Sequence, residues 1–178
     1  MSATMEIRTE GEQAIERRLA NIAAATGDLS PLLADFGMYL ESSTIERFDT
    51  ETAPDGSKWK ASIRAKEEGG KTLTDSATLR RSIRHIASGD SVEVGSNLEY
   101  AGVHNFGFSG TVQVAAHVRE TSTVFGRRLG GPIAFKVGPF ARTMSIPQRQ
   151  FLGLSAEDET ELNALTDDYI LAAGGTAQ

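Results

Sequence analysis

Three histidines are the residues most capable of metal or acid–base chemistry in this chain: His85, His104 and His117. A metal site that can be detected locally needs imidazoles and carboxylates at helical spacing, as in H-x-x-x-H or H-E-x-x-H. None of the three histidines lies in such a pattern, and the chain has no cysteine to supply thiolate ligands. The sequence therefore predicts no metal and no cofactor, and it favours structural or surface roles for His104 and His117.

Carboxylates are crowded into one stretch, residues 49–72, where they include Glu51, Asp55, Glu67 and Glu68. Two carboxylates perform acid–base catalysis when they lie at a defined separation in different environments. Nothing in the flanking sequence indicates that these groups are buried, so a solvated acidic loop is the favoured interpretation. The alternative is a small metal-dependent enzyme that combines these carboxylates with His104 and His117.

Arginine and glycine occur together in residues 126–131, but the flanking sequence predicts a hairpin and not the strand-to-helix turn of a phosphate-binding loop. A nucleophile elbow of the form G-x-S-x-G is also missing. Arg80, Arg81 and Arg84 could contact an acidic partner or DNA, although a solvated surface is the simpler interpretation. The chain is therefore predicted not to be an enzyme.

The composition indicates a single domain over residues 1–178, with a flexible tail from residue 174. A hydrophobic content of 39% and 18 glycines predict long polar loops, here near 49–72 and 119–133. The net charge of −6 argues against a sequence-specific nucleic-acid binder. No stretch is apolar enough for a signal peptide or a membrane span, so we expect assembly in the cytoplasm and no membrane partner.

Helical periodicity occurs at both ends of the chain. A capping box at residues 9–12 predicts a first helix that ends at Gly27, with an apolar stripe of Ile15, Leu19, Ile22 and Ala23. Ser30 as N-cap and Pro31 in the first turn predict a second helix that ends near Phe48 and forms a hairpin with the first. Ser155 is expected to cap a last helix.

The middle of the chain alternates as strands do. After a short helix capped by Asp75, a hairpin is expected over residues 82–87 and 91–95, and a short helix over 100–106. A strand at 112–118 should pair with one near 134–143, which Gly138-Pro139 interrupts, and residues 119–132 should form a flexible excursion between them. The expected fold is α+β: a mixed or antiparallel sheet of about four strands, packed by an N-terminal helical hairpin and a C-terminal helix.

Four motifs follow one another at fixed distances. The first is a turn, Pro54-Asp55-Gly56, followed by the only tryptophan, Trp59, which we expect to anchor the loop in the core. The others lie in residues 73–83, 92–107 and 146–155. In this order they resemble the virion morphogenesis family of Mu-like tailed bacteriophages, which is similar to the P2-type tail completion proteins. Ser76-Ala77 departs from the resemblance, because a glycine is expected before Leu79.

The resemblance implies a structural subunit of the tail-completion or neck apparatus, a tail terminator at the head–tail junction. Such a subunit would form a ring of about six copies around the DNA channel. Its partners would be its own copies, the tail tube and the neck or connector proteins, and its location would be the tail or neck of the virion. An assembly chaperone that is absent from the mature particle is the alternative.

Two groups of residues are singled out. The first is expected to shape the subunit and not to react: Pro54, Asp55, Gly56, Trp59, Tyr100, His104, Phe106, Gly107, Pro147, Arg149, Phe151 and Leu152. The second lies in the expected excursion and is a candidate subunit or tail interface: Arg119, Phe125, Arg127, Arg128 and Leu129.

Overall fold

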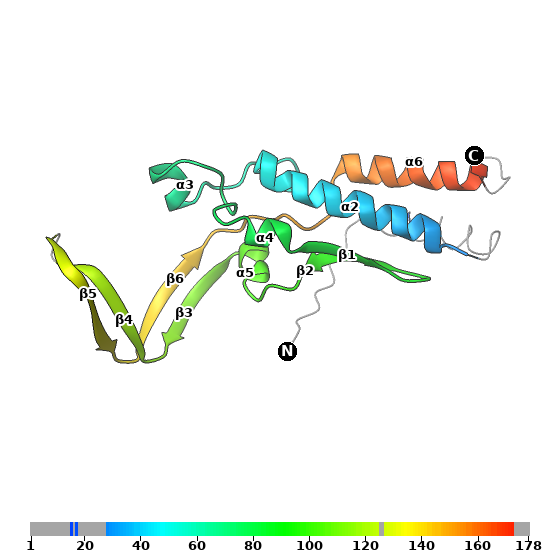
Figure 1. Cartoon of the computed structure of the whole chain (residues 1–178). Helices are drawn as coiled ribbons and strands as arrows, with labels where there is room; N and C mark the ends of the chain where they lie inside the picture. Colours follow the sequence, from blue (N-terminus) through cyan, green and yellow to red (C-terminus); the bar gives the residue numbers. More distant parts are fainter. Residues whose placement is uncertain (1–14, 16, 18–27, 125–126, 173–178) are drawn as a thin grey trace. The chain divides into compact units, whose positions relative to one another are not determined.

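The structure, a computed structural model, describes residues 15, 17, 28–124 and 127–172. The chain divides into two compact units (Figure 1). The helical unit comprises Met1–Gly107 and Pro147–Gln178, and the ribbon unit comprises Phe108–Ile146. The ribbon unit is thus an insertion between two parts of the helical unit.

The helix α2, Ser30–Thr50, is the longest described helix of the helical unit. Pro31 occupies its first turn, as predicted, but Ser30 is not the N-cap: Leu29 holds that position without a side-chain hydrogen bond. Asp28 replaces the expected serine cap, because its Oδ1 accepts a hydrogen bond from the Ser30 amide at 2.9 Å. The helix ends where Glu51 adopts a left-handed conformation with φ of 55°.

The helix α2 packs against both a β-hairpin and the C-terminal helix α6, Ala156–Ala172 (Figure 1). The hairpin consists of β1, Ile83–Ala87, and β2, Val92–Ser96, which pair antiparallel. Its turn contains the predicted Gly89-Asp90, and the Ser88 amide donates to the Ser91 carbonyl across it. The two strands and the last helix are therefore confirmed.

Two apolar clusters hold the helical unit together, and α2 contributes to both. One cluster lies toward the end of α2 and consists of Phe48, Trp59, Leu79, Ile83, Ala101, Phe151 and Leu152. The Phe48 ring meets Trp59 edge-on at a centroid distance of 5.4 Å and meets Phe151 at 5.1 Å. The other cluster joins α2 to α6 through Leu32, Leu33, Phe36 and Leu162.

Three short helices connect these elements: α3, Ile63–Glu67, α4, Thr78–Arg81, and α5, Ala101–Phe106. The prediction of an unstructured loop at 49–72 was wrong in part, because the Ser62 side chain caps α3 by accepting from the Ala65 amide. Asp75 does not cap α4 as predicted; Ala77 is the N-cap residue, at φ of 56°. The helix α5 and the glycine after it are as expected.

Four strands make up the ribbon unit: β3, Phe108–Val114, β4, His117–Val124, β5, Arg127–Val137, and β6, Phe140–Ile146. They form two antiparallel pairs, β3 with β6 and β4 with β5. The two pairs are separated by short breaks that lie opposite each other: residues 115–116, between β3 and β4, and residues 138–139, between β5 and β6. The expected single strand at 112–118 is therefore wrong, whereas the predicted interruption at Gly138-Pro139 is confirmed.

The α+β class is confirmed, but the predicted sheet is not. The described residues form three separate two-stranded antiparallel sheets and no four-stranded one, because each strand pairs with a single neighbour. Most of the expected excursion at 119–132 belongs to β4 and β5. The expected first helix lies outside the described residues except for Ile15, which packs against the α2–α6 cluster, and residue 17. The tail from 174 also lies outside them. Across the part that is described, no helix is long and apolar enough to span a bilayer.

Candidate functional site

The segment 149–153, which leads into α6, has its backbone bound by distant parts of the helical unit. The Arg149 amide donates to the His104 carbonyl at 2.8 Å, and the Arg149 Nε donates to the Lys60 carbonyl at 2.7 Å. Pro147 is partly buried directly after β6. The segment also carries two buried apolar side chains of the core: Phe151 and Leu152. The Arg149 side chain thus holds a carbonyl group, as the sequence predicted.

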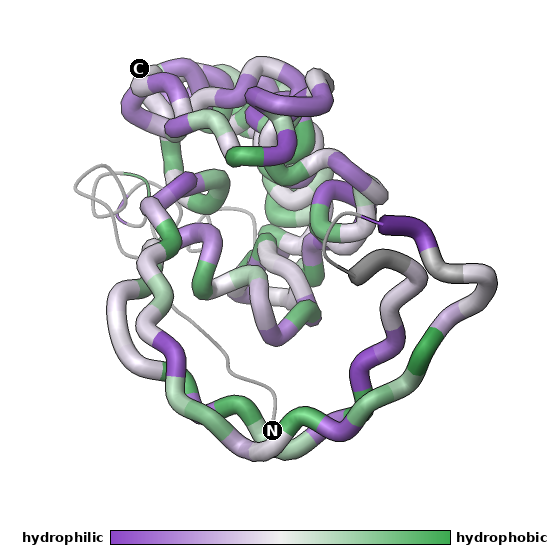
Figure 2. Tube along the Cα trace, turned by 90° about the vertical axis from the view of Figure 1, so that its left-hand side faces the viewer, coloured by the Kyte–Doolittle hydropathy of each residue, from purple (hydrophilic) through white to green (hydrophobic). Residues whose placement is uncertain are grey.

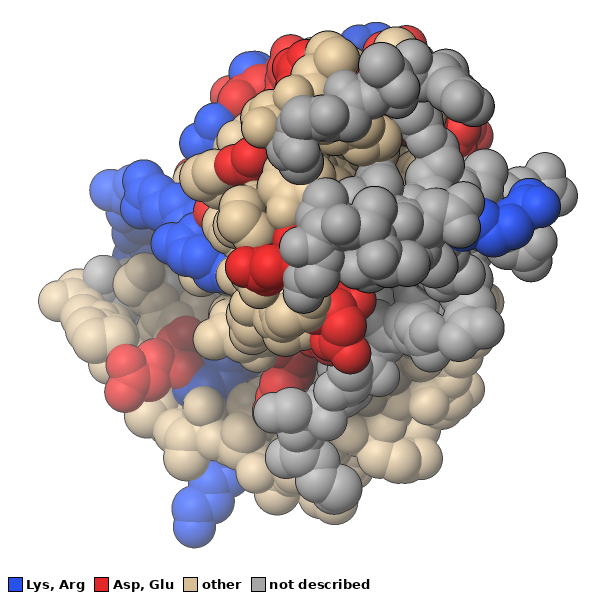
Figure 3. All heavy atoms as spheres, turned by 90° about the vertical axis from the view of Figure 1, so that its right-hand side faces the viewer, with Lys and Arg blue, Asp and Glu red and all other residues tan. Residues whose placement is uncertain are grey.

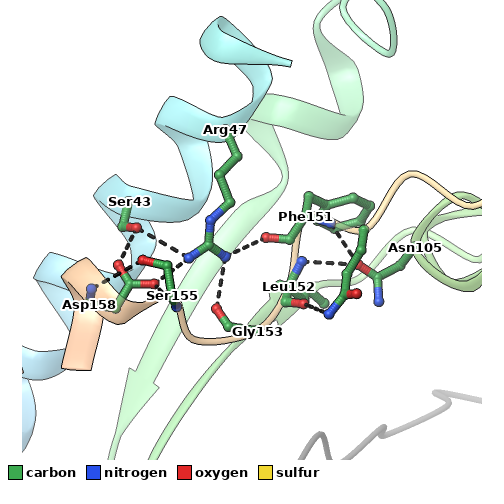
Figure 4. A network of polar contacts seen from close by, with 9 residues as sticks. Ser43, Arg47, Asn105, Phe151, Leu152, Gly153, Ser155 and Asp158 are labelled. Atoms are coloured by element: carbon green, nitrogen blue, oxygen red, sulfur yellow. Dashed lines mark hydrogen bonds and ion pairs between the residues drawn. The ribbon is translucent and has the colours of Figure 1, made fainter. Parts of the chain in front are cut away.

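Arg47, near the end of α2, binds this segment from the other side (Figure 4). Its Nη1 donates to the carbonyls of Phe151 and Gly153, both at 2.8 Å. Its Nη2 forms an ion pair with the buried carboxylate of Asp158. Burial lowers the pKa of Arg47, and the negative charge of Asp158 opposes that shift. The guanidinium therefore joins α2, the segment and α6 in one polar cluster.

Asp158 is also half of a capping box at the start of α6 (Figure 4). The Asp158 amide donates to the Ser155 Oγ at 3.1 Å, and the Ser155 amide donates to the Asp158 Oδ2 at 2.8 Å. The predicted cap by Ser155 is confirmed. The carboxylate that returns the hydrogen bond is the same one that pairs with Arg47, so helix capping and the ion pair are coupled.

Asn105 holds the segment from α5. Its Oδ1 accepts hydrogen bonds from the amides of Phe151 and Leu152, both at 2.9 Å (Figure 4). The side chain is fully buried, and its Nδ2 has no partner among the described residues. Two accepted amide bonds fix the orientation of the Asn105 side chain, which gives it a positioning role.

The Pro54-Asp55-Gly56 turn forms as predicted. Asp55 Oδ1 accepts from the Ser57 amide at 2.9 Å, and Gly56 has φ of 79°. Trp59 is 8% exposed, which confirms its predicted burial, and its Nε1 donates to the Gln150 carbonyl at 2.8 Å. The tryptophan therefore ties the turn to the same segment that Arg47 and Asn105 bind.

The residues predicted around α5 have mixed exposure. Tyr100 and Phe106 are both exposed, whereas His104 is partly buried and meets the Tyr100 ring edge-on at a centroid distance of 6.0 Å. Burial, and secondarily the charge of Arg149, lowers the pKa of His104. Gly107 ends α5 at φ of 75°. Both effects favour the neutral form of this imidazole.

A solvent-open hollow of about 420 Å³ lies between the Pro54-Asp55-Gly56 turn and the start of α6. Its lining includes Glu157 and Glu159 and no basic side chain, which makes it unsuited to an anionic ligand. In the described part of the chain, no three residues of the His, Asp and Glu types are grouped so that they could hold a metal ion.

The candidate interface residues lie in the ribbon unit. Arg119, on β4, and Arg127 and Arg128, on β5, are exposed. Leu129 belongs to β5, and Phe125 lies outside the described residues. The structure thus places the other four positions in strands, not in the flexible loop that the sequence predicted.

Three residues of the cluster were missed by sequence reasoning: Arg47, Asn105 and Asp158. A local signal existed for one of them, since Ser155 and Asp158 have the spacing of a capping box. Arg47 and Asp158 are 111 residues apart in the chain, and no local pattern pairs them.

Comparison with known proteins assigns the chain to a family. The model of the Phage virion morphogenesis family matches residues 11–170. The chain belongs to this family. It is also 27% identical over 165 residues to Mu-like prophage FluMu G protein 2 of Haemophilus influenzae. The matched residues make up 93% of this chain and 95% of that protein. No solved structure matches the chain. Members of the Phage virion morphogenesis family are typically structural and not enzymes, and the cluster described above suits a structural role.

Proposed function

We propose that this virion morphogenesis protein is a tail-completion or tail-terminator subunit at the head–tail junction of a tailed phage. It forms a ring of about six copies around the DNA channel and contacts the tail tube and the neck proteins. In this proposal the protein remains in the tail or neck of the virion. The family assignment supports the general role, and the two-unit architecture supports the ring.

The main support for a ring is the exposure of the side chains in the ribbon unit. None of the side chains described in it is buried, and Val118, Ile133, Phe135 and Phe140 are each more than 40% exposed. An isolated two-stranded hairpin is at best marginally stable in water. A ribbon of this kind is therefore expected to gain its stability from a partner surface, which a closed ring supplies at every subunit.

Quantitative mass spectrometry of purified virions tests the proposal. We expect the protein at about six copies per tail, and we expect a null mutant to accumulate filled heads and tails that do not join. If the protein is needed for assembly but missing from finished virions, the assembly chaperone is the better interpretation.

A further inference from the structure

The β3–β6 half of the ribbon has one apolar face and one polar face. Cross-strand pairs such as Phe108 with Ile146 and Val114 with Phe140 place their side chains on the same face of the sheet. The apolar face consists of Phe108, Val112, Val114, Phe140, Met144 and Ile146, together with Gly110 and Arg142. The opposite face consists of Ser109, Thr111, Gln113, Ala141, Thr143 and Ser145, all exposed.

Hydrophobic and hydrophilic stretches also alternate along the trace of the ribbon in Figure 2. The Phe108 ring lies over Gly110, where an added Cβ would be 3.1 Å from the Phe108 Cζ. Phe108 and Phe140 are nevertheless 36% and 43% exposed. An apolar face of this kind, rimmed by polar residues, is typical of a protein–protein contact.

Arg142 is the one charged residue on this face, directly across from Val112. Among the described residues no carboxylate lies within ion-pair distance of it, and its Nη2 donates to the Met144 sulfur at 3.1 Å. A guanidinium that becomes buried with an apolar face needs polar partners, and a carboxylate also compensates its charge. A covering surface that carries carboxylates therefore suits this face.

The two units carry opposite charge. Residues 108–146 contain five of the 18 basic residues and one of the 24 acidic residues, which gives the ribbon unit a net charge of +4. The remaining 13 basic and 23 acidic residues give the helical unit −10. The charges therefore favour contact between the ribbon of one copy and the helical unit of another.

The exposed face of α6 has the matching chemistry. This helix contains six acidic residues and no basic one. Glu157, Glu161 and Asp168 are exposed, recur at helical spacing and form no ion pair in the described structure. The small side chain of Ala164 lies between them on the same exposed face, and Leu171 extends it. These five residues are called the acidic strip.

We propose that the apolar face of β3–β6 in one copy docks on the acidic strip of α6 in a second copy, with Arg142 paired to its carboxylates. The contact is heterologous, because a strand face meets a helix face, so repeated contacts can close a ring. The proposal rests on the proposed function for its ring geometry. It specifies which two surfaces meet.

A double-stranded nucleic acid is the other occupant that a ribbon of net charge +4 could attract. The apolar side chains around Arg142 disfavour it, because phosphate contacts come from polar and charged groups. The face drawn in Figure 3 carries both acidic and basic side chains of the described residues.

Disulfide trapping between two chains tests the docking directly, because the protein has no cysteine of its own. One full-length chain carries Val112→Cys, on the apolar face, and the other carries Ala164→Cys, on the acidic strip. Mixing them under mild oxidation is expected to give a covalent heterodimer. The matched control is Thr111→Cys, the neighbouring residue on the polar face, which should give at least about tenfold less heterodimer.

Charge reversal provides a second readout, by light scattering on a sizing column. Arg142→Glu is expected to weaken self-association by about tenfold or more, and Glu161→Arg is expected to do the same. Combining the two reversals should restore association in part, whereas Thr143→Glu, on the polar face, should change it little. Circular dichroism of each variant confirms that the helical unit is folded.

Several outcomes overturn the docking proposal: a monomeric wild-type chain, equal trapping through Val112→Cys and Thr111→Cys, or no rescue by the paired reversal. Retention of double-stranded DNA that Arg142→Glu abolishes would assign the ribbon to nucleic acid instead. If rings form normally with Arg142→Glu, the docking surfaces are wrong while the ring proposal stands. If virions lack the protein although trapping succeeds, the ring at the head–tail junction is wrong and the contact stands.

Discussion

At the scale of single residues, Arg47 is central to the polar cluster, because its guanidinium binds three groups from distant parts of the chain. It is 6% exposed and serves two backbone carbonyls and one carboxylate, each from a part of the chain about 100 residues away. A buried guanidinium with a complete set of partners stabilises one arrangement of its surroundings and disfavours others.

We expect Arg47→Met to lower the free energy of unfolding by about 3–5 kcal/mol, since it leaves the Asp158 charge buried and two carbonyls without donors. Urea denaturation followed by tryptophan fluorescence measures the change. Adding Asp158→Asn to this variant should recover part of the loss, because the unpaired charge is then removed. Arg81→Met, at an exposed arginine, is the control, and an equal loss in both single variants would contradict the prediction.

The titration of His104 is expected to make the free energy of unfolding depend on pH. Its folded-state pKa lies below the ordinary value of 6.5 because of burial and the Arg149 charge, so the unfolded chain binds the proton more tightly. The contribution of His104 is therefore complete above pH 6.5 and is lost as the pH falls from there toward the folded-state pKa. Thermal unfolding between pH 8 and pH 5 should show this slope, and His104→Gln should flatten it. Parallel curves for the two proteins would rule out the role of His104.

At the scale of secondary-structure elements, α2 and β1 approach closely at a glycine. A Cβ on Gly37 would lie 2.4 Å from the Cδ2 of His85 and 3.1 Å from the Cγ2 of Val92. Glu41 fixes the His85 ring, because its Oε2 lies 2.7 Å from Nδ1 and also accepts from the His85 amide at 2.9 Å. The ring cannot turn away without breaking these contacts.

Gly37→Ala should therefore destabilise the protein by about 1–3 kcal/mol, although alanine is the better helix former by about 1 kcal/mol. Gly102→Ala in α5 is the matched control, since an added Cβ there meets nothing within 4 Å. That control should be neutral or stabilising. Chemical denaturation of both variants gives the comparison, and a stabilised Gly37→Ala protein would show that the hairpin does not pack on α2 as described.

The element-level predictions that succeeded rest on local causes, although two other local predictions, the caps by Ser30 and Asp75, were wrong. Ser155, Pro31 and the Gly138-Pro139 interruption all act within a few residues, through a cap, a fixed φ and a missing amide donor. The matching break at residues 115–116 lies opposite Gly138-Pro139 and has no such signal in its own sequence. The division into three sheets was unpredictable for the same reason: alternation shows which residues share a face, and it does not show which strands pair.

The residues of the candidate site also divide into those that the sequence predicted and those whose role depends on distant contacts. Trp59, Arg149 and Phe151 were predicted as packing and positioning residues, and all three are buried. Asn105 lies within one of the recognised motifs, yet its function depends on backbone amides 46 and 47 residues away. Contacts over such sequence distances require the folded structure.

At the scale of the whole molecule, the residues that stabilise the fold lie in the helical unit, whereas the two surfaces proposed for assembly are divided between the units, the apolar face of β3–β6 in the ribbon unit and the acidic strip in the helical unit. Every residue of the two core clusters belongs to the helical unit. The ribbon unit leaves and re-enters it at Phe108 and Ile146, which are paired across the β3–β6 ladder. Paired residues in an antiparallel ladder lie about 4.5–5.5 Å apart, a gap that a short turn can bridge.

Replacing residues 109–145 with a four-residue Asn- and Gly-containing turn is therefore expected to leave the helical unit folded. The free energy of unfolding should change by less than about 1 kcal/mol, because a two-stranded ribbon contributes little stability of its own. The same deletion should abolish ring formation and the joining of heads to tails in a complementation assay. A control turn of the same composition that replaces only residues 88–91, at the tip of the β1–β2 hairpin, should preserve both. Assembly at normal yield without the ribbon would show that subunits meet through the helical unit, whereas an unfolded deletion variant would show that the ribbon contributes to the fold itself.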